Sequence, residues 1–148
     1  MLKHILVPLD RSKLSEQALD YARRVVDPAG RLTLMTAVEP PVPAVTNLFP
    51  DPNEYRAMHL DLLEDAEIYL ENKRDVVKDA VANVICEAHA GMPATAILEV
   101  AHDLAVDAIV MSTHGRTGIS RWVFGSVTQK VLAEAPCPVF VIPARKVT

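Results

Sequence analysis

Glycines and cationic side chains are concentrated in one segment of this chain, residues 111–127. Three of the five glycines lie there, at positions 115, 118 and 125. The segment also holds His114, Arg116 and Arg121, and it contains no Asp or Glu. Glycine lets a backbone approach a ligand closely, and the lack of carboxylates removes repulsion of an anion. These residue types favour the binding of a phosphate group.

The place of this segment between two expected elements supports the same interpretation. An apolar stretch typical of a strand, Asp107–Met111, precedes it, and a helix is expected to begin at Gly125–Ser126. The first N–H groups of a helix form a ready anion site. The segment is not a Walker loop, because no Gly-Lys-Ser/Thr follows. The alternative is that the glycines serve only the geometry of a loop that binds no ligand. Arg116 and Arg121 would then be surface residues that contribute to solubility.

Each of the other residues with a reactive or ligating side chain can also be explained by a purely structural role. Asp10, after the first expected strand, can serve a ligand or cap a helix, and the sequence leaves both open. His114 fits a loop histidine facing water better than a general base. The remaining histidines show no metal-ligand spacing: His4, His59, His89 and His102. Cys86 and Cys137 have no CxxC spacing and are expected to be buried free thiols.

Composition narrows the class of protein. A chain of 148 residues, half of them hydrophobic, is expected to form a single globular domain over residues 1–148. A net charge of −4 argues against nucleic acid as the main partner. No apolar run approaches the roughly 18 residues of a membrane span. The N-terminus lacks the pattern of a signal peptide, so we expect a cytoplasmic protein that does not bind membranes.

Apolar periodicity predicts alternating strands and helices. The strands are expected at Lys3–Leu9, Arg31–Val38, Asn83–Ala90, Asp107–Thr113 and Cys137–Pro143. The helices are expected from a cap at Ser12 or Ser15 to Asp27–Pro28, at Glu54–Ala82, at Pro93–Val106 and from Ser126 to Pro136. The inward positions of the first helix are expected to be Leu14, Ala18, Ala22 and Val25. Residues 39–53 hold five of the eleven prolines and are expected to form a surface loop or flap.

This alternation predicts an α/β fold with a parallel sheet covered by helices on both faces. In such sheets ligands bind beyond the carboxyl ends of the strands, at the point where the strand order reverses. The first strand ends near Asp10 and the fourth near Ser112. If these two strands are neighbours, both residues border one cleft.

The chain resembles the universal stress protein family over residues 1–145. The resemblance is carried by Lys3–Asp10, by Gly91–Leu98, and above all by residues 107–127 with Pro136–Val139. It implies a flavodoxin-like, doubly wound sheet of five parallel strands in the order 3-2-1-4-5. It also implies a homodimer.

The nucleotide-binding branch of that family carries G-x-x-G, nine residues, then G-S or G-T. Gly115, nine residues and Gly125-Ser126 match its last two elements, whereas Ser112 occupies the position of the first glycine. The resemblance implies that Asp10 meets the adenine or ribose and that Val38 packs on the base. Met111 and Ser112 would line the sugar, and His114, Gly115, Gly125, Ser126 and Val127 would hold the phosphates. The implied nucleotide-binding residues are Pro8, Leu9, Asp10, Val38, Met111, Ser112, His114, Gly115, Arg116, Gly125, Ser126 and Val127.

The function expected from this resemblance is that of a stress-response protein that binds ATP and acts as a sensor or regulator. Residues 111–127 offer neither an acid nor a lysine, so any Mg²⁺ would be held mainly by phosphates and water. Fast phosphoryl transfer is therefore not expected, and slow hydrolysis stays open. The alternative is a nucleotide-free dimeric interaction module, which Ser112 favours.

The fifth expected strand, within Pro138–Pro143, should lie at an edge of the sheet. Its uncharged apolar side chains would be an aggregation hazard unless the edge is covered. We expect a homodimer that pairs through this strand, since the flanking prolines limit the ladder to a few residues. The alternative is that residues 144–148, or the loop after the second strand, cover the edge.

Overall fold

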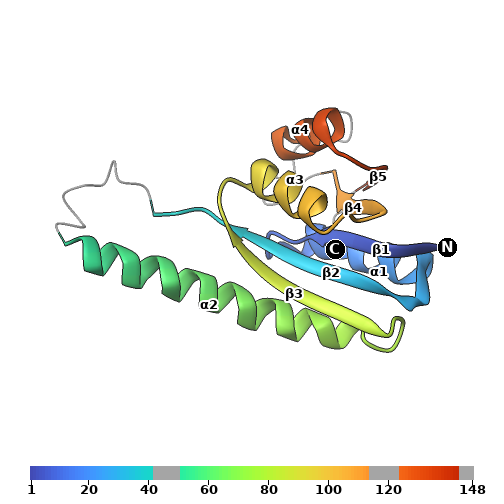
Figure 1. The fold of residues 1–148 in the computed structure, drawn as a ribbon, viewed down its shortest axis with the longest axis horizontal. Coiled ribbons are helices and arrows are strands. Elements are labelled where there is room, and N and C mark those ends of the chain that lie inside the picture. The colour runs from blue at the N-terminus through green and yellow to red at the C-terminus, as the bar shows by residue number, and fades with distance from the viewer. Residues whose placement is uncertain (42–50, 114–123, 144–148) are drawn as a thin grey trace.

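The structure of the chain is a computed structural model, and it describes residues 1–41, 51–113 and 124–143. Five strands form one sheet in the order β3-β2-β1-β4-β5, and every neighbouring pair is parallel (Figure 1). The strands are β1 (Leu2–Pro8), β2 (Val26–Val38), β3 (Asn83–Ala90), β4 (Ala108–Ser112) and β5 (Val139–Ile142). The predicted α/β class and strand order are confirmed.

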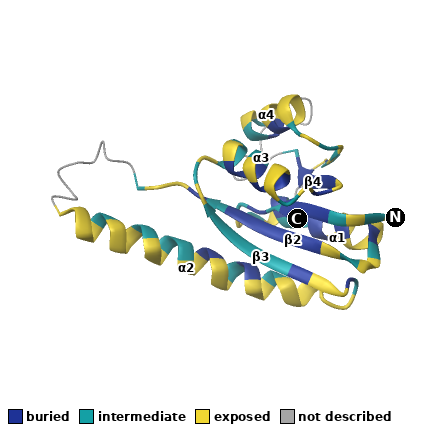
Figure 2. Cartoon of the chain, in the orientation of Figure 1, coloured by how far each residue is buried: buried dark blue, intermediate teal, exposed yellow. Residues whose placement is uncertain are grey.

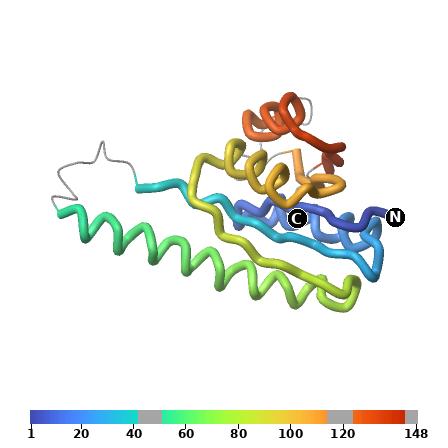
Figure 3. The backbone as a smooth tube through the Cα atoms, viewed as in Figure 1, coloured from blue at the N-terminus to red at the C-terminus, as the bar shows by residue number. Residues whose placement is uncertain are grey.

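Four helices cover the two faces of this sheet: α1 (Lys13–Val25), α2 (Pro52–Val77), α3 (Pro93–Asp103) and α4 (Ser126–Glu134). Figure 1 shows α3 and α4 together on one side of the strands and α2 along the other. In Figure 3, β3 lies beside the second part of α2, and the two elements are in contact. Each face therefore carries its own helical layer.

Side-chain alternation along the strands builds a separate apolar core under each layer. Val7, Leu34 and Val110 pack with residues of α1 and α2, whereas Leu6, Met35 and Ile109 pack with residues of α3 and α4. The central strands are buried, and the outward side of α2 is exposed (Figure 2). The near-continuous apolar runs of β1 and β4 follow from this burial on both faces.

Local sequence signals set several helix starts. Ser12 caps α1, and its Oγ accepts a hydrogen bond from the N–H of Ser15 at 3.1 Å. Asp51 caps α2 in the same way, accepting from the N–H of Asn53 at 2.8 Å. Pro52 and Pro93 occupy the first positions of α2 and α3, where a missing N–H is tolerated. Of the two caps expected for the first helix, the structure uses Ser12.

Several predicted boundaries are wrong. β2 begins at Val26 rather than Arg31, since Val26 pairs with Leu2 as soon as α1 ends. Asp27–Pro28, expected to end the first helix, is part of this strand, where the Pro28 carbonyl accepts from the N–H of Ala82 at 2.8 Å. α2 spans Pro52–Val77 instead of Glu54–Ala82, and α3 ends at Asp103 instead of Val106.

The buried side of α1 also differs from the prediction. Ser15, Ala18, Leu19 and Ala22 are buried there, whereas Leu14 is half-buried and Val25 is exposed. Val25 is the last residue of α1, and the chain continues from it directly into β2 at Val26. Cys86 and Cys137 are free thiols, as expected, but both are only half-buried.

Candidate functional site

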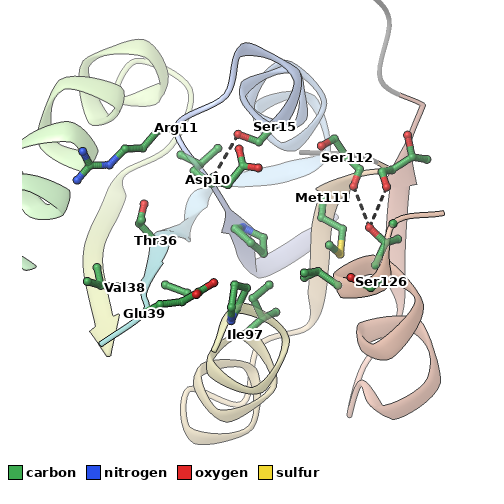
Figure 4. Close-up of a pocket in the computed structure, with 18 of the residues that line it drawn as sticks. Asp10, Arg11, Ser15, Thr36, Val38, Glu39, Ile97, Met111, Ser112 and Ser126 are labelled. Carbon is green, nitrogen blue, oxygen red and sulfur yellow. Dashed lines mark hydrogen bonds between the residues drawn. The ribbon is translucent and has the colours of Figure 1, made fainter. Parts of the chain in front are cut away.

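A cavity of about 640 Å³ opens at the carboxyl ends of β1, β2 and β4 (Figure 4). β1 and β4 are neighbours, with Ile5 opposite Ala108. From β1 the chain proceeds outward to β2 and β3, and then returns to add β4 and β5 on the other side. The cavity therefore lies at the point where the strand order reverses, which is where ligands bind in open α/β sheets.

The structure brings most of the predicted site residues to this one cavity. Those that line it are Pro8, Leu9, Asp10, Val38, Met111, Ser112, Gly125, Ser126 and Val127. His114, Gly115 and Arg116 lie outside the described residues, as do Gly118 and Arg121. The convergence of Asp10 and Ser112 in one cleft is confirmed, and the ligand-binding roles of all these residues stay predictions.

Sequence reasoning missed other residues of the lining: Arg11, Ser15, Thr36, Ala37, Glu39, Leu62, Pro93, Ile97, Thr113 and Thr128. A signal existed for some of them, because Thr36, Ala37 and Glu39 flank Val38 at the end of a strand. Leu62 and Ile97 come from α2 and α3, which carry no local sign of the cavity. Only the packing of these helices against the sheet brings the two side chains there.

The start of α4 is held against the end of β4. The N–H of Gly125 donates to the carbonyl of Thr113 at 3.2 Å. The Thr128 hydroxyl donates to the carbonyls of Ser112 and Thr113, at 3.3 and 3.1 Å. Thr128 is only 2% exposed, so this anchor is shielded from water. These contacts fix the first turn of α4 at the rim of the cavity.

This first turn is suited to an anion. Within the described residues, no side chain caps α4 and no acidic residue lies in its first turn. The N–H groups that begin a helix have no partner inside it and carry partial positive charge. α1 differs, because Ser12 caps it. Gly125, Ser126 and Val127 line the cavity at this helix start, and their predicted role in holding phosphates stays a prediction.

The turn between β1 and α1 forms another part of the lining. Asp10 accepts hydrogen bonds from both the backbone N–H and the hydroxyl of Ser12, so its carboxylate stabilises the turn while it borders the cavity. Arg11 adopts a left-handed backbone conformation, with φ of 70°. Non-glycine residues rarely adopt this conformation, and here it directs the chain from the strand into the helix.

A polar cluster connects this turn to α2. The Tyr69 hydroxyl donates to Glu16 Oε1 at 2.8 Å, and Lys73 Nζ lies 3.1 Å from the same oxygen. The Arg11 guanidinium lies 5.7 Å from the centre of the Tyr69 ring. Burial, together with Glu16, raises the pKa of Tyr69, so its hydroxyl stays a donor. The cluster holds α2, and with it Leu62, beside the cavity.

Charge is distributed unevenly around the cavity. Among its described residues the charged side chains are Asp10, Arg11 and Glu39, which follow β1 and β2. The opposite end is bounded by the backbone of the α4 start. No group of three or more His, Cys, Asp or Glu side chains arranged to hold a metal occurs in the described residues. The described charged side chains of the cavity thus follow β1 and β2, whereas the start of α4 favours anions.

Residues 1–143 match the model of the universal stress protein family. The chain belongs to the universal stress protein family. The universal stress protein Sll1654 of Synechocystis is 32% identical over 97% of this chain and 87% of its own length. The solved structure of MJ0577, a universal stress protein of Methanocaldococcus jannaschii, is 26% identical, covers 99% of both chains and has a TM-score of 0.85.

Two further members of the universal stress protein family share the fold and were solved with an adenine nucleotide. One is a universal stress protein in complex with cAMP, with 21% identity, 97% and 98% coverage and a TM-score of 0.65. The other, from Arabidopsis thaliana, has AMP bound, with 15% identity, 97% and 92% coverage and a TM-score of 0.63. At these identities the likeness to our chain concerns the fold alone.

Ser112, which replaces the first glycine of the motif, is open to a direct test. It is 6% exposed at the end of β4, and its carbonyl accepts the Thr128 hydroxyl. Ser112→Gly keeps that carbonyl, so we expect nucleotide affinity to be unchanged or tighter in calorimetry. A loss of about tenfold, 1.4 kcal/mol, would show that the Ser112 hydroxyl contacts the nucleotide itself.

Proposed function

We propose that this protein binds an adenine nucleotide, ATP, in the cavity and acts as a cytoplasmic sensor or regulator in a stress response. The uncapped start of α4 at the rim of the cavity is the observation that carries the proposal. The volume of about 640 Å³ falls within the range of small-molecule sites. The two family structures with cAMP and AMP support the choice of an adenine nucleotide.

Charge and polarity orient the nucleotide in this proposal. The triphosphate would lie at Gly125, Ser126 and Val127, where the N–H groups of the α4 start attract negative charge. The nucleoside would lie at the other end, beside Val38 and Asp10, because the carboxylates there repel phosphate. Mg²⁺, if bound, would be held mainly by phosphate oxygens and water.

Nucleotide release from the purified protein tests the proposal. We expect acid precipitation to release ATP that copurified with the protein. We also expect the nucleotide-free protein to bind ATP with a micromolar dissociation constant, about −8 kcal/mol, in calorimetry. Absence of nucleotide in the extract, together with no measurable binding at millimolar ATP, would contradict the proposal.

The second candidate function is a dimeric interaction module of the same fold that binds no nucleotide. Ser112 favours it, because a side chain occupies the position at which the motif has glycine. The release and titration experiments separate the two candidates. A stable dimer that takes up no ATP would support the second.

A further inference from the structure

Thr36 of β2 has a buried hydroxyl without a partner among the described residues. The residue is 5% exposed, and its Oγ1 has no hydrogen-bond partner within the described part of the chain. It also belongs to the lining of the cavity, and Figure 4 places it between Arg11 and Val38. A buried hydroxyl that makes no hydrogen bond destabilises the protein that carries it. A ligand atom in the cavity would supply the missing partner.

The surroundings of Thr36 indicate which part of a ligand would meet it. Thr36 and Val38 lie two positions apart on the same face of β2, toward α1 and α2. Val38, with Leu62 of α2, provides apolar surface at this end of the cavity. A heteroaromatic base has apolar faces and a polar edge. It suits a place where apolar side chains border a single hydroxyl.

A phosphate group fits this place less well. Asp10 and Glu39 also line the cavity, and Arg11 is the one cation among the described lining residues. The Arg11 guanidinium already lies over the Tyr69 ring. The α4 start has uncapped N–H groups and no acidic residue in its first turn. Negative charge is therefore better placed at α4, away from Thr36.

We propose that Thr36 Oγ1 hydrogen-bonds the edge of the nucleotide base and that Thr36 is a specificity-determining residue of the site. This inference rests on the proposed function and deepens it. A hydroxyl can both donate and accept, so it can pair with an amino group or a ring nitrogen. In the ligand-free protein the hydroxyl lowers stability, and in the complex it is satisfied.

Thr33 provides a matched control on the same strand. It is also buried, but its Oγ1 lies 2.8 Å from His4 Nε2, and it is absent from the cavity lining. Replacing either threonine by valine removes one hydroxyl at nearly constant shape. The two replacements should have opposite consequences for the ligand-free protein, because of the two hydroxyls only that of Thr33 has a partner in the described part of the chain.

The experiment measures thermal unfolding without nucleotide and calorimetric affinity with it. We expect Thr36→Val to raise Tm of the ligand-free protein by about 3 °C and to weaken ATP binding about fivefold. Thr36→Ser keeps the hydroxyl and should bind ATP like the wild type. Thr33→Val should lower Tm and leave ATP affinity unchanged.

Nucleotide analogues identify the group that meets the hydroxyl. If it meets the base, Thr36→Val weakens ATP, AMP and 2′-deoxy-ATP by the same factor. An effect that disappears with AMP would assign the contact to the outer phosphates, and one that disappears with 2′-deoxy-ATP would assign it to the ribose. Either result overturns the proposal.

The remaining outcomes separate this inference from the proposed function. Wild-type ATP affinity in Thr36→Val, with binding intact in the wild type, overturns the role of Thr36 alone. A lower Tm in ligand-free Thr36→Val also overturns it, because the hydroxyl would then have a partner in the empty protein. Failure of the wild type to bind any adenine nucleotide overturns both.

Discussion

Gly125→Val abolishes ATP binding while the protein stays folded: we expect the dissociation constant to rise at least about 100-fold, 2.7 kcal/mol. Gly125 lies at the start of α4 and lines the cavity. A valine side chain there would separate a phosphate from the N–H groups of the first turn. The backbone of Gly125 has φ −60° and ψ 159°, an extended conformation that valine adopts without strain. The loss of binding therefore does not depend on unfolding.

Calorimetry with ATP measures the effect, and thermal unfolding without nucleotide verifies the fold. Gly125→Ala adds a single methyl group and should give an intermediate loss. Phe124→Ala alters the adjacent residue, which is exposed and absent from the cavity lining, and should bind ATP like the wild type. Equal affinity in the wild type and Gly125→Val would show that the phosphates do not bind at the α4 start.

The apolar periodicity was sufficient to predict alternating strands and helices, because the apolar runs of this chain are separated by clear helical segments. The strand order came from the resemblance to the universal stress protein family. β3 was placed at its observed bounds, Asn83–Ala90, and the pairing of β1 with β4 followed from the strand order that the family resemblance implied. The predicted residues that line the cavity follow strands or begin a helix. These positions can be recognised locally, because strand ends and helix starts have signals in a few neighbouring residues.

Features that depend on distant contacts could not be predicted in the same way. β2 begins at Val26 because Leu2 pairs with it, although Pro28 and Gly30 favour a turn. The left-handed backbone conformation of Arg11 could not be predicted from its being an arginine. The missing partner of Thr36 becomes visible only when every polar neighbour on the sheet, α1 and α2 is known. The most informative residue of the candidate site was therefore one that the sequence did not single out.

The second prediction with a large expected effect concerns the edge strand β5 and the proposed homodimer. β5 pairs only with β4 in the described sheet. The carbonyls of Pro138 and Ile142 accept from Ile109 and Thr113 of the β4 side, both at 3.0 Å.

The carbonyls of Pro138 and Ile142 thus point inward, and backbone alternation turns the N–H and C=O groups of Val139 and Val141 to the outer edge. Phe140 is 43% exposed beside them. This edge suits a second copy of the same strand. Residues 144–148, which were the alternative candidates for covering this edge, lie outside the described residues.

Val141→Lys should convert the dimer into a monomer, or into a precipitate, at micromolar concentration. Across a two-fold axis the two new lysines would come close together, and like charges on opposite strands repel. We expect the dimer dissociation constant to rise at least about tenfold, 1.4 kcal/mol, in sedimentation. The soluble fraction should still bind ATP, since Val141 is absent from the cavity lining.

Ile68→Lys, at a residue of α2 that is 56% exposed, should remain dimeric as the control. A dimeric Val141→Lys variant would place the interface elsewhere, and a monomeric wild type would exclude a dimer at these concentrations.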